Sequence, residues 1–175
     1  SKAARSTCRK AGERGTGTGT DDERLALIRE TAKLSPTYID VELSIGEELH
    51  NLGRAIKEGG TKLIISHHDF ERTPSYEDLS SIVEKQYAYG ADIAKVACMG
   101  TSMADNVKVF RLISDNVARG REVIGLVMGR YGKLSRVASP MLGAHLTFAS
   151  LESGKESAPG QLSIDEMRRA YELLS

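Results

Sequence analysis

Short apolar runs rich in β-branched residues recur along this chain, with room for one helix between most of them. The runs lie at 38–43, 62–66, 92–97, 123–128 and 145–149, and a weaker one lies at 4–9. Strands that are buried on both faces of a parallel sheet are apolar throughout, whereas half-exposed strands alternate apolar with polar residues. Each run is therefore expected to be a strand of a parallel sheet.

Helical patterns fill the intervals between these runs. Apolar residues recur at helical spacing over 21–34, 49–56, 76–87, 107–117 and 163–174. Two of these segments open on a capping box, Thr20 with Glu23 and Ser163 with Glu166. Alternating strands and helices with short loops fit either an open doubly wound sheet or a closed (β/α)8 barrel. The chain contains about six strand–helix units, whereas the barrel needs eight.

Composition excludes several classes of protein. The chain has 175 residues and a formal net charge of zero, so nothing favours binding to nucleic acid or to an anionic membrane. No apolar run approaches the roughly 18 residues of a membrane-spanning helix. The two cysteines, Cys8 and Cys98, lack metal-ligand spacing and are interpreted as free thiols of a cytoplasmic protein. A globular protein with a single domain over residues 1–175 is expected.

Lys95 lies in the middle of the apolar segment 91–100, although an ammonium group is costly to bury. One interpretation is a lysine at a strand end that reaches solvent, or one that pairs with Asp92 or Asp69. The other is a desolvated amine that loses its proton readily and attacks a carbonyl carbon. The residues alone support both interpretations.

Two of the four histidines, His67 and His68, are adjacent and follow directly on a predicted strand. Functional residues gather at the carboxyl ends of parallel strands, and an imidazole there is suited to carry protons. Successive side chains of a strand point to opposite faces, so only one of the two faces a given site. The chain has no His-x-x-x-His, His-Glu-x-x-His or Cys-x-x-Cys pattern, so no metal is expected.

Basic residues gather in the predicted loop 128–136, which holds Arg130, Lys133 and Arg136. An arginine there is suited to bind a carboxylate through two parallel hydrogen bonds. A solvated basic loop is the simpler interpretation of the same residues.

Two further loops carry polar groups. The 156–163 loop contains Ala-Pro-Gly, and it is either a plain turn or a lid that brings Ser157 and Gln161 onto a polar ligand. The glycine-rich 12–20 segment matches no phosphate-binding pattern, but Glu13 within it is close enough to a predicted strand to reach a site.

Taken in order, these segments resemble one enzyme family. The motifs are His-Asp-Phe-x-x-Thr-Pro at 68–74, Ala-Asp-Ile-x-Lys at 91–95, Met-Gly-x-x-Gly-x-x-Ser-Arg at 128–136, Leu-Thr-Phe at 146–148 and Ser-Ala-Pro-Gly-Gln at 157–161. From about Thr7 to the C-terminus, this order resembles type I 3-dehydroquinate dehydratase of the shikimate pathway. The resemblance implies a (β/α)8 barrel that eliminates water from 3-dehydroquinate through a lysine Schiff base, with no metal or organic cofactor.

The resemblance also implies roles for individual residues. Lys95 is similar to the lysine that forms the imine, and His68 is similar to the general acid and base. Glu13 is similar to the acid that supports this histidine. Substrate-binding positions carried over in the same way are Arg9, Arg136 on the carboxylate, Ser157 and Gln161 in the closing loop, and Met128 and Phe148 on an apolar wall.

Two departures from the family pattern change the expectation. Arg14 replaces a glycine of the family, and the first two strand–helix units are absent, with a Glu-x-Arg motif of the substrate site. The expected fold is therefore a (β/α)8 barrel truncated at its N-terminus to about six units. Such a chain is a fragment of a longer polypeptide, a domain completed by another chain or segment, or a divergent relative with weakened activity. A homodimer is a further expectation.

Two other functions stand beside the dehydratase. One is a weakly active or inactive barrel that serves as an assembly or partner-binding module through its open sheet edges. The other is a Schiff-base lyase of the aldolase kind, for which basic residues of 128–136 supply a phosphate site. The Ala-Pro-Gly-Gln segment favours the dehydratase, an enzyme of aromatic amino acid biosynthesis.

Overall fold

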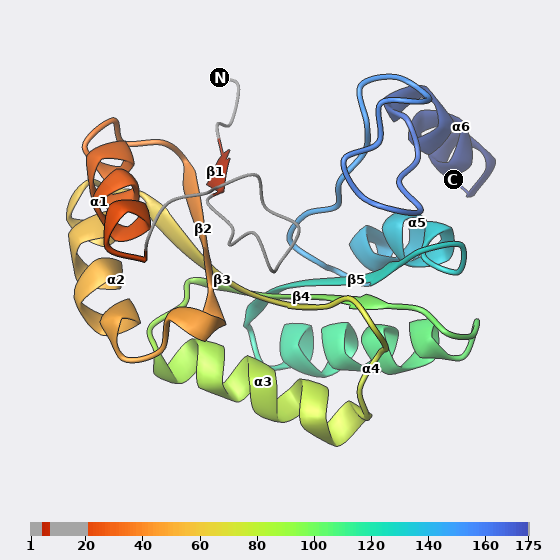
Figure 1. The fold of residues 1–175 in the computed structure, drawn as a ribbon. Helices are drawn as coiled ribbons and strands as arrows, with labels where there is room; N and C mark the ends of the chain where they lie inside the picture. The colour runs from red at the N-terminus through yellow and green to blue at the C-terminus, as the bar shows by residue number, and fades with distance from the viewer. Residues whose placement is uncertain (1–4, 8–20, 175) are drawn as a thin grey trace. The chain divides into compact units, whose positions relative to one another are not determined.

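Strands and helices alternate along the computed structural model, which describes residues 5–7 and 21–174 (Figure 1). The strands form one sheet in the order β1-β2-β3-β4-β5, with the bounds β1 Arg5–Thr7, β2 Tyr38–Glu42, β3 Lys62–Asp69, β4 Ile93–Met99 and β5 Glu122–Met128. The helices are α1 Asp21–Ala32, the 3-10 turn η2 Leu43–Ile45, α2 Glu48–Glu58, α3 Tyr76–Ala88, α4 Asp105–Ala118, α5 Lys133–Met141 and α6 Ile164–Leu174. β1 pairs with β2 and β2 with β3 in parallel, which confirms the predicted α/β alternation.

The chain folds as two compact units, which are described separately. The first comprises Ser1–His67 and Ile82–Lys95, and the second comprises His68–Ser81 and Val96–Ser175. The predicted barrel domain over residues 1–175 stays a prediction.

In the first unit, one face of β2 and β3 packs against the helices α1 and α2, which lie side by side (Figure 1). Helix α2 buries Leu49, Leu52 and Ile56 at helical spacing, as its sequence predicts. These residues join a core that also contains Ile39 and Val41 of β2. The two strand residues are two positions apart and therefore share the helix-facing side.

The opposite face of β2 is charged rather than apolar. Asp40 and Glu42 alternate with the core residues of the strand, and their exposed fractions are only 1% and 3%. On the neighbouring strand, Asp40 lies opposite Ile64 and Glu42 opposite Ser66. Buried carboxylates are costly unless they are paired, so this face is the first place to look for a function.

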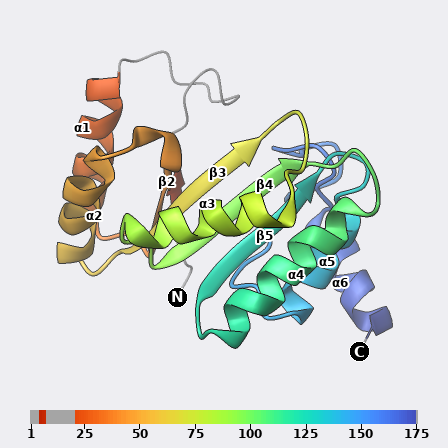
Figure 2. The same cartoon turned by 90° about the horizontal axis from the view of Figure 1, so that it is seen from below.

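In the second unit, helix α4 packs along β5 and also contacts α5 (Figure 2). A glycine permits the close approach of helix and strand. A Cβ atom added to Gly125 of β5 would lie 2.8 Å from a methyl carbon of Val109 and 3.0 Å from Ile113. The two helix residues are fully buried against the strand.

Two predicted elements differ in the structure. The strand expected at 145–149 is not formed. This segment makes isolated contacts instead of a ladder of hydrogen bonds. His145 N–H donates to Val123 O, and Ser150 forms an isolated bridge with Ser163. The predicted 128–136 loop ends early, and Lys133 opens helix α5.

Helix α5 was not predicted because Pro140, in its last turn, interrupts the helical pattern of the sequence. Proline has no N–H, so the carbonyl four residues earlier loses its helical partner. That carbonyl belongs to Arg136, and the Thr147 hydroxyl donates to it at 2.8 Å. A side chain outside the helix thus replaces the missing hydrogen bond.

Candidate active site

Lys95 of β4 is buried, with a side chain only 2% exposed, and its Nζ lies 2.6 Å from Oδ2 of Asp40. The interpretation of a lysine that reaches solvent is therefore wrong. The two predicted partners are also wrong, because both carboxylates are bound elsewhere. Asp92 binds Lys57 Nζ and the N–H of Leu63 at 2.8 Å each, and Asp69 accepts from the N–H groups of Glu71 and Arg72 at 2.9 Å.

The backbone at Lys95 is held from helix α3. Gln86 of α3 is fully buried, and its Nε2 donates to the Lys95 carbonyl at 2.8 Å. The lysine is thus fixed at both ends, by an amide at its backbone and by a carboxylate at its amine. Fixing both ends limits the directions in which the amine can move.

Asp40 is the residue of this site that sequence reasoning missed. The signal was present, since Asp40 and Glu42 interrupt the apolar strand 38–43 in the same way that Lys95 interrupts its own strand. Charged residues at alternate positions of a buried strand share one face. Two such strands in one sheet predict a buried ion pair, but the sequence does not say which residues meet.

His68 lies near the carboxyl end of β3, and its ring stacks on Phe70, with ring centroids 5.9 Å apart and planes 10° apart. The alternation along β3 puts His68 in the series of Ile64 and Ser66, on the charged side of the strand. His67 continues the core series of the other side. This alternation supports the assignment of His68, which stays a prediction.

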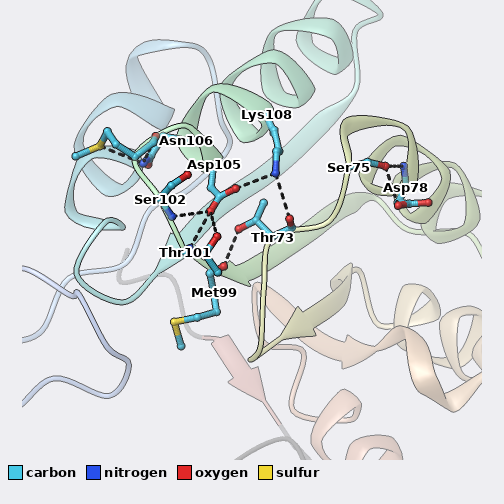
Figure 3. A network of polar contacts seen from close by, with 10 residues as sticks. Thr73, Ser75, Asp78, Met99, Thr101, Ser102, Asp105, Asn106 and Lys108 are labelled. Atoms are coloured by element: carbon cyan, nitrogen blue, oxygen red, sulfur yellow. Dashed lines mark hydrogen bonds and ion pairs between the residues drawn. The ribbon is translucent and has the colours of Figure 1, made fainter.

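A polar network at the start of α4 fixes the loop that follows β4 (Figure 3). Asp105 is its centre, and its Oδ2 accepts from the N–H groups of Thr101 and Ser102 at 2.8 and 3.0 Å and from the Thr101 hydroxyl at 3.0 Å. Burial alone would raise the pKa of Asp105. Hydrogen bonds from Lys108, Ser102 and Thr101 outweigh burial and lower this pKa to about 2.

The same network reaches the loop after β3. Lys108 Nζ donates to Asp105 Oδ1 at 2.8 Å and to the Thr73 carbonyl at 3.3 Å. The Thr73 hydroxyl in turn donates to the Met99 carbonyl at 2.9 Å (Figure 3). The segment that begins with His68 is therefore tied to the carboxyl end of β4.

Asp105→Asn is expected to remove an acid-sensitive part of the stability. The pKa of Asp105 is about 2 instead of 3.8, so its contribution is complete above pH 4 and is lost as the pH falls from 3.8 towards 2. A shift of this size corresponds to about 2 kcal/mol. Urea unfolding between pH 2 and pH 6 should show a flatter stability curve for the variant. Asp165→Asn, at a carboxylate 89% exposed, is the control and should leave the curve unchanged.

Arg136 lies on α5 and is 2% exposed. Its Nε donates to the carbonyl of Gly160 at 3.0 Å, and Nη2 donates to the carbonyl of Pro159 at 3.3 Å. Burial lowers the pKa of its guanidinium to about 10, so it remains charged at neutral pH. The structure thus brings Arg136 onto the 156–161 loop, and its predicted contact with a substrate carboxylate stays a prediction.

Ser157 and Gln161 meet at the two ends of this loop. Oε1 of Gln161 accepts from the N–H of Ser157 at 2.8 Å and from its hydroxyl at 3.2 Å. Lys133 and the residues 156–161 line an open hollow of about 520 Å³. The structure brings the Ser157 hydroxyl and the Gln161 amide together beside this hollow, and their predicted contact with a polar ligand stays a prediction.

Gly160→Ala is expected to displace the 156–161 loop from its position against Gly129. Gly160 has a φ of +76°, and an added Cβ would lie 2.1 Å from the carbonyl oxygen of Gly129, which backbone atoms do not tolerate. We expect KM for the substrate to rise at least tenfold, measured by steady-state kinetics. Gly154→Ala is a matched control, because its φ is +85° but nothing lies within 4 Å of the added atom. A similar loss in both variants would mean that backbone strain alone is responsible.

The remaining predicted positions are less informative. Met128 ends β5 and is buried, and Phe148 is half-buried in the extended segment before Ser150. Arg9 and Glu13 lie outside the described residues. Within residues 23–174, no three His, Cys, Asp or Glu side chains gather to hold a metal ion. No helix of the described part is long and apolar enough to cross a membrane.

Comparisons with known proteins agree with the predicted family. The family model of type I 3-dehydroquinase matches residues 6–175. A 3-dehydroquinate dehydratase of Methanosarcina mazei is 38% identical over 171 residues, which are 96% of this chain and 71% of that protein. The crystal structure of 3-dehydroquinate dehydratase from Geobacillus kaustophilus matches with a TM-score of 0.89 and 30% identity, over 97% of this chain and 66% of that one.

A second solved structure matches almost as well. It is a type I 3-dehydroquinate dehydratase from Clostridium difficile with covalently modified comenic acid, at a TM-score of 0.88 and 30% identity, over 97% of this chain and 68% of that one. The chain thus spans about two thirds of the length of the two solved relatives. The family predicted from the motifs is confirmed: the chain belongs to the type I 3-dehydroquinase family.

Proposed function

We propose that this protein removes water from 3-dehydroquinate to give 3-dehydroshikimate, through an imine on Lys95. The observation that carries the proposal is a buried lysine on β4, held at its amine and its backbone, in a chain of the type I 3-dehydroquinase family. The relatives bear the name 3-dehydroquinate dehydratase, an enzyme of the shikimate pathway and of aromatic amino acid biosynthesis.

The chemistry explains why a lysine is needed. A ketone makes the neighbouring C–H only weakly acidic, whereas a protonated imine is a stronger electron sink. Lys95 forms the C=N bond at C3 of the substrate, and the carbonyl oxygen leaves as water. The proton at C2 can then leave to a base, and the resulting enamine expels the hydroxyl group at C1. Hydrolysis of the imine releases the product and restores Lys95.

The base in this proposal is His68. An imidazole accepts and returns protons near neutral pH, so one residue can take the C2 proton and protonate the departing hydroxyl. Its place on the charged side of β3 supports this role. Glu13 is proposed to orient the ring.

Other residues are proposed to bind the carboxylate and the hydroxyl groups of the substrate. Arg136 is proposed to bind the carboxylate, and Ser157 and Gln161 to bind hydroxyl groups from the loop that Arg136 holds. The other proposed contacts are Arg9 as a second cation and Met128 and Phe148 as an apolar wall. A homodimer and a cytoplasmic location stay predictions.

Borohydride trapping tests the function. The reagent reduces an imine to a stable secondary amine, so protein incubated with 3-dehydroquinate and borohydride should gain one substrate-derived mass on the Lys95 peptide. The Lys57 peptide, whose amine is paired with Asp92, is the internal control and should stay unmodified. Formation of 3-dehydroshikimate is followed by its absorbance. Absence of both the adduct and the product would overturn the proposal.

A further inference from the structure

We infer that Asp40 is a positioning residue of this site, the fixed counter-ion of the Lys95 nitrogen in both its ammonium and its iminium form. The inference rests on the proposed function and deepens it. It assigns a role to a residue that neither the motifs nor the relatives' names indicate.

The geometry of the pair carries the inference. Nζ and Oδ2 are 2.6 Å apart, and the two side chains are 2% and 1% exposed. Lys95 lies on β4 and Asp40 on β2, with β3 between them in the sheet, so the lysine reaches across a whole strand to its partner. Gln86 fixes the lysine backbone, which leaves the side chain directed towards Asp40.

The charge on the Lys95 nitrogen explains how the carboxylate of Asp40 would act in the reaction. An ammonium and a ketone combine to give an iminium and water, and the nitrogen carries one positive charge before and after this step. A buried carboxylate stays compensated at both ends of the reaction. It also keeps the imine protonated, and only the protonated imine withdraws electrons strongly from C2.

Other charged groups face the same region. Within the first unit, Glu42 lies on the same face of β2 as Asp40. Helix α3 contributes the neutral amide of Gln86, and β5 carries no ionisable side chain from Val123 to Met128. Among the carboxylates of the described residues, Asp40 lies at an ion-pair distance from the amine, 2.6 Å, so its removal should have a larger effect on the lysine than removal of Glu42.

Asp40→Asn separates the two effects of the carboxylate. Without the negative charge the ammonium is disfavoured, so the amine becomes neutral at lower pH and attacks the ketone more readily there. The iminium is disfavoured for the same reason, so proton loss from C2 slows. We expect the pH midpoint of rapid-quench adduct formation on Lys95 to move at least one unit towards acid, while kcat falls at least a hundredfold.

These changes distinguish positioning from a structural role. A purely structural role would lower the rate of adduct formation and kcat together and leave the pH midpoint of adduct formation in place. Glu42→Gln should move the midpoint less than Asp40→Asn does. Asp92→Asn removes another lysine–carboxylate pair of the same unit and should not move it. An unchanged midpoint in Asp40→Asn, or a larger shift in Glu42→Gln, would overturn the inference.

Two controls separate loss of folding and loss of the proposed function from loss of the role of Asp40. If Asp40→Asn does not fold, a double variant that also carries Lys95→Met is made. It removes both charges of the pair and is expected to fold. A double variant that stays unfolded would overturn the pairing of Asp40 with Lys95. Failure of the function itself is recognised separately, because the unmodified protein would then form no adduct at any pH. An adduct in the unmodified protein with no shift in the variant refutes only the role of Asp40.

Discussion

Lys95→Met is expected to reduce turnover to background, a loss on the order of 10⁴-fold or more, and to abolish the borohydride adduct. Methionine fills a similar volume but has no amine, so no imine forms and the C2 proton stays weakly acidic. Steady-state production of 3-dehydroshikimate and the mass of the Lys95 peptide measure the two effects.

The same substitution should also destabilise the fold. Asp40, whose side chain is 1% exposed, would lose the ammonium at 2.6 Å, and breaking a buried pair costs about 3 kcal/mol or more. Urea unfolding measures this loss. Lys57→Met is the matched control, because the Lys57–Asp92 pair has the similar N–O distance of 2.8 Å but is 40% and 30% exposed, and should cost less than about 1 kcal/mol. Turnover that survives in Lys95→Met would show that the reaction runs without this amine.

His68→Ala and His67→Ala should differ strongly although the residues are neighbours. The loss of a general acid and base lowers kcat by about 10²- to 10⁴-fold, and this loss is expected for His68. His67 points to the other side of β3, so its substitution should lower kcat less than about tenfold. The pair is its own control, since both variants remove an imidazole from the same end of the same strand.

The pH dependence of kcat sharpens this comparison. A general base gives the profile an ionisation that disappears with the imidazole, so the acidic limb should flatten in His68→Ala and persist in His67→Ala. Equal losses in the two variants, or a limb that vanishes only with His67, would reverse the assignment.

The strands and helices were largely predictable because local pattern decides them. The apolar runs at 38–43 and 62–66 became β2 and β3, and the capping box at Ser163 formed as expected: its N–H donates to Glu166 Oε2 at 2.7 Å, and Glu166 N–H donates back to its hydroxyl at 3.2 Å. Helix α5 was missed because Pro140 breaks the pattern, and the hydroxyl that compensates for it comes from a distant segment.

The site was predictable in its parts and less so in its pairings. The apolar neighbours of Lys95 marked it as unusual, but the sequence left open whether its amine is buried or reaches solvent. Its partner does not follow from the sequence, because Asp40 is 55 residues away and the two meet only through the order and register of three strands. Proximity in the sequence suggested Asp92 as the partner, but its carboxylate accepts a hydrogen bond from the N–H of Leu63 at the start of β3.

The manner in which Arg136 holds the 156–161 loop has a consequence for engineering. The arginine binds carbonyl oxygens of Pro159 and Gly160, which every residue possesses, so these two contacts depend on the path of the loop backbone and not on its side chains. A library that varies Ser157 and Gln161 while keeping Pro159 and Gly160 should therefore retain the two contacts with Arg136. Selection from such a library would test whether positions 157 and 161 decide the preference for hydroxyl groups, while the contacts of Arg136 stay in place.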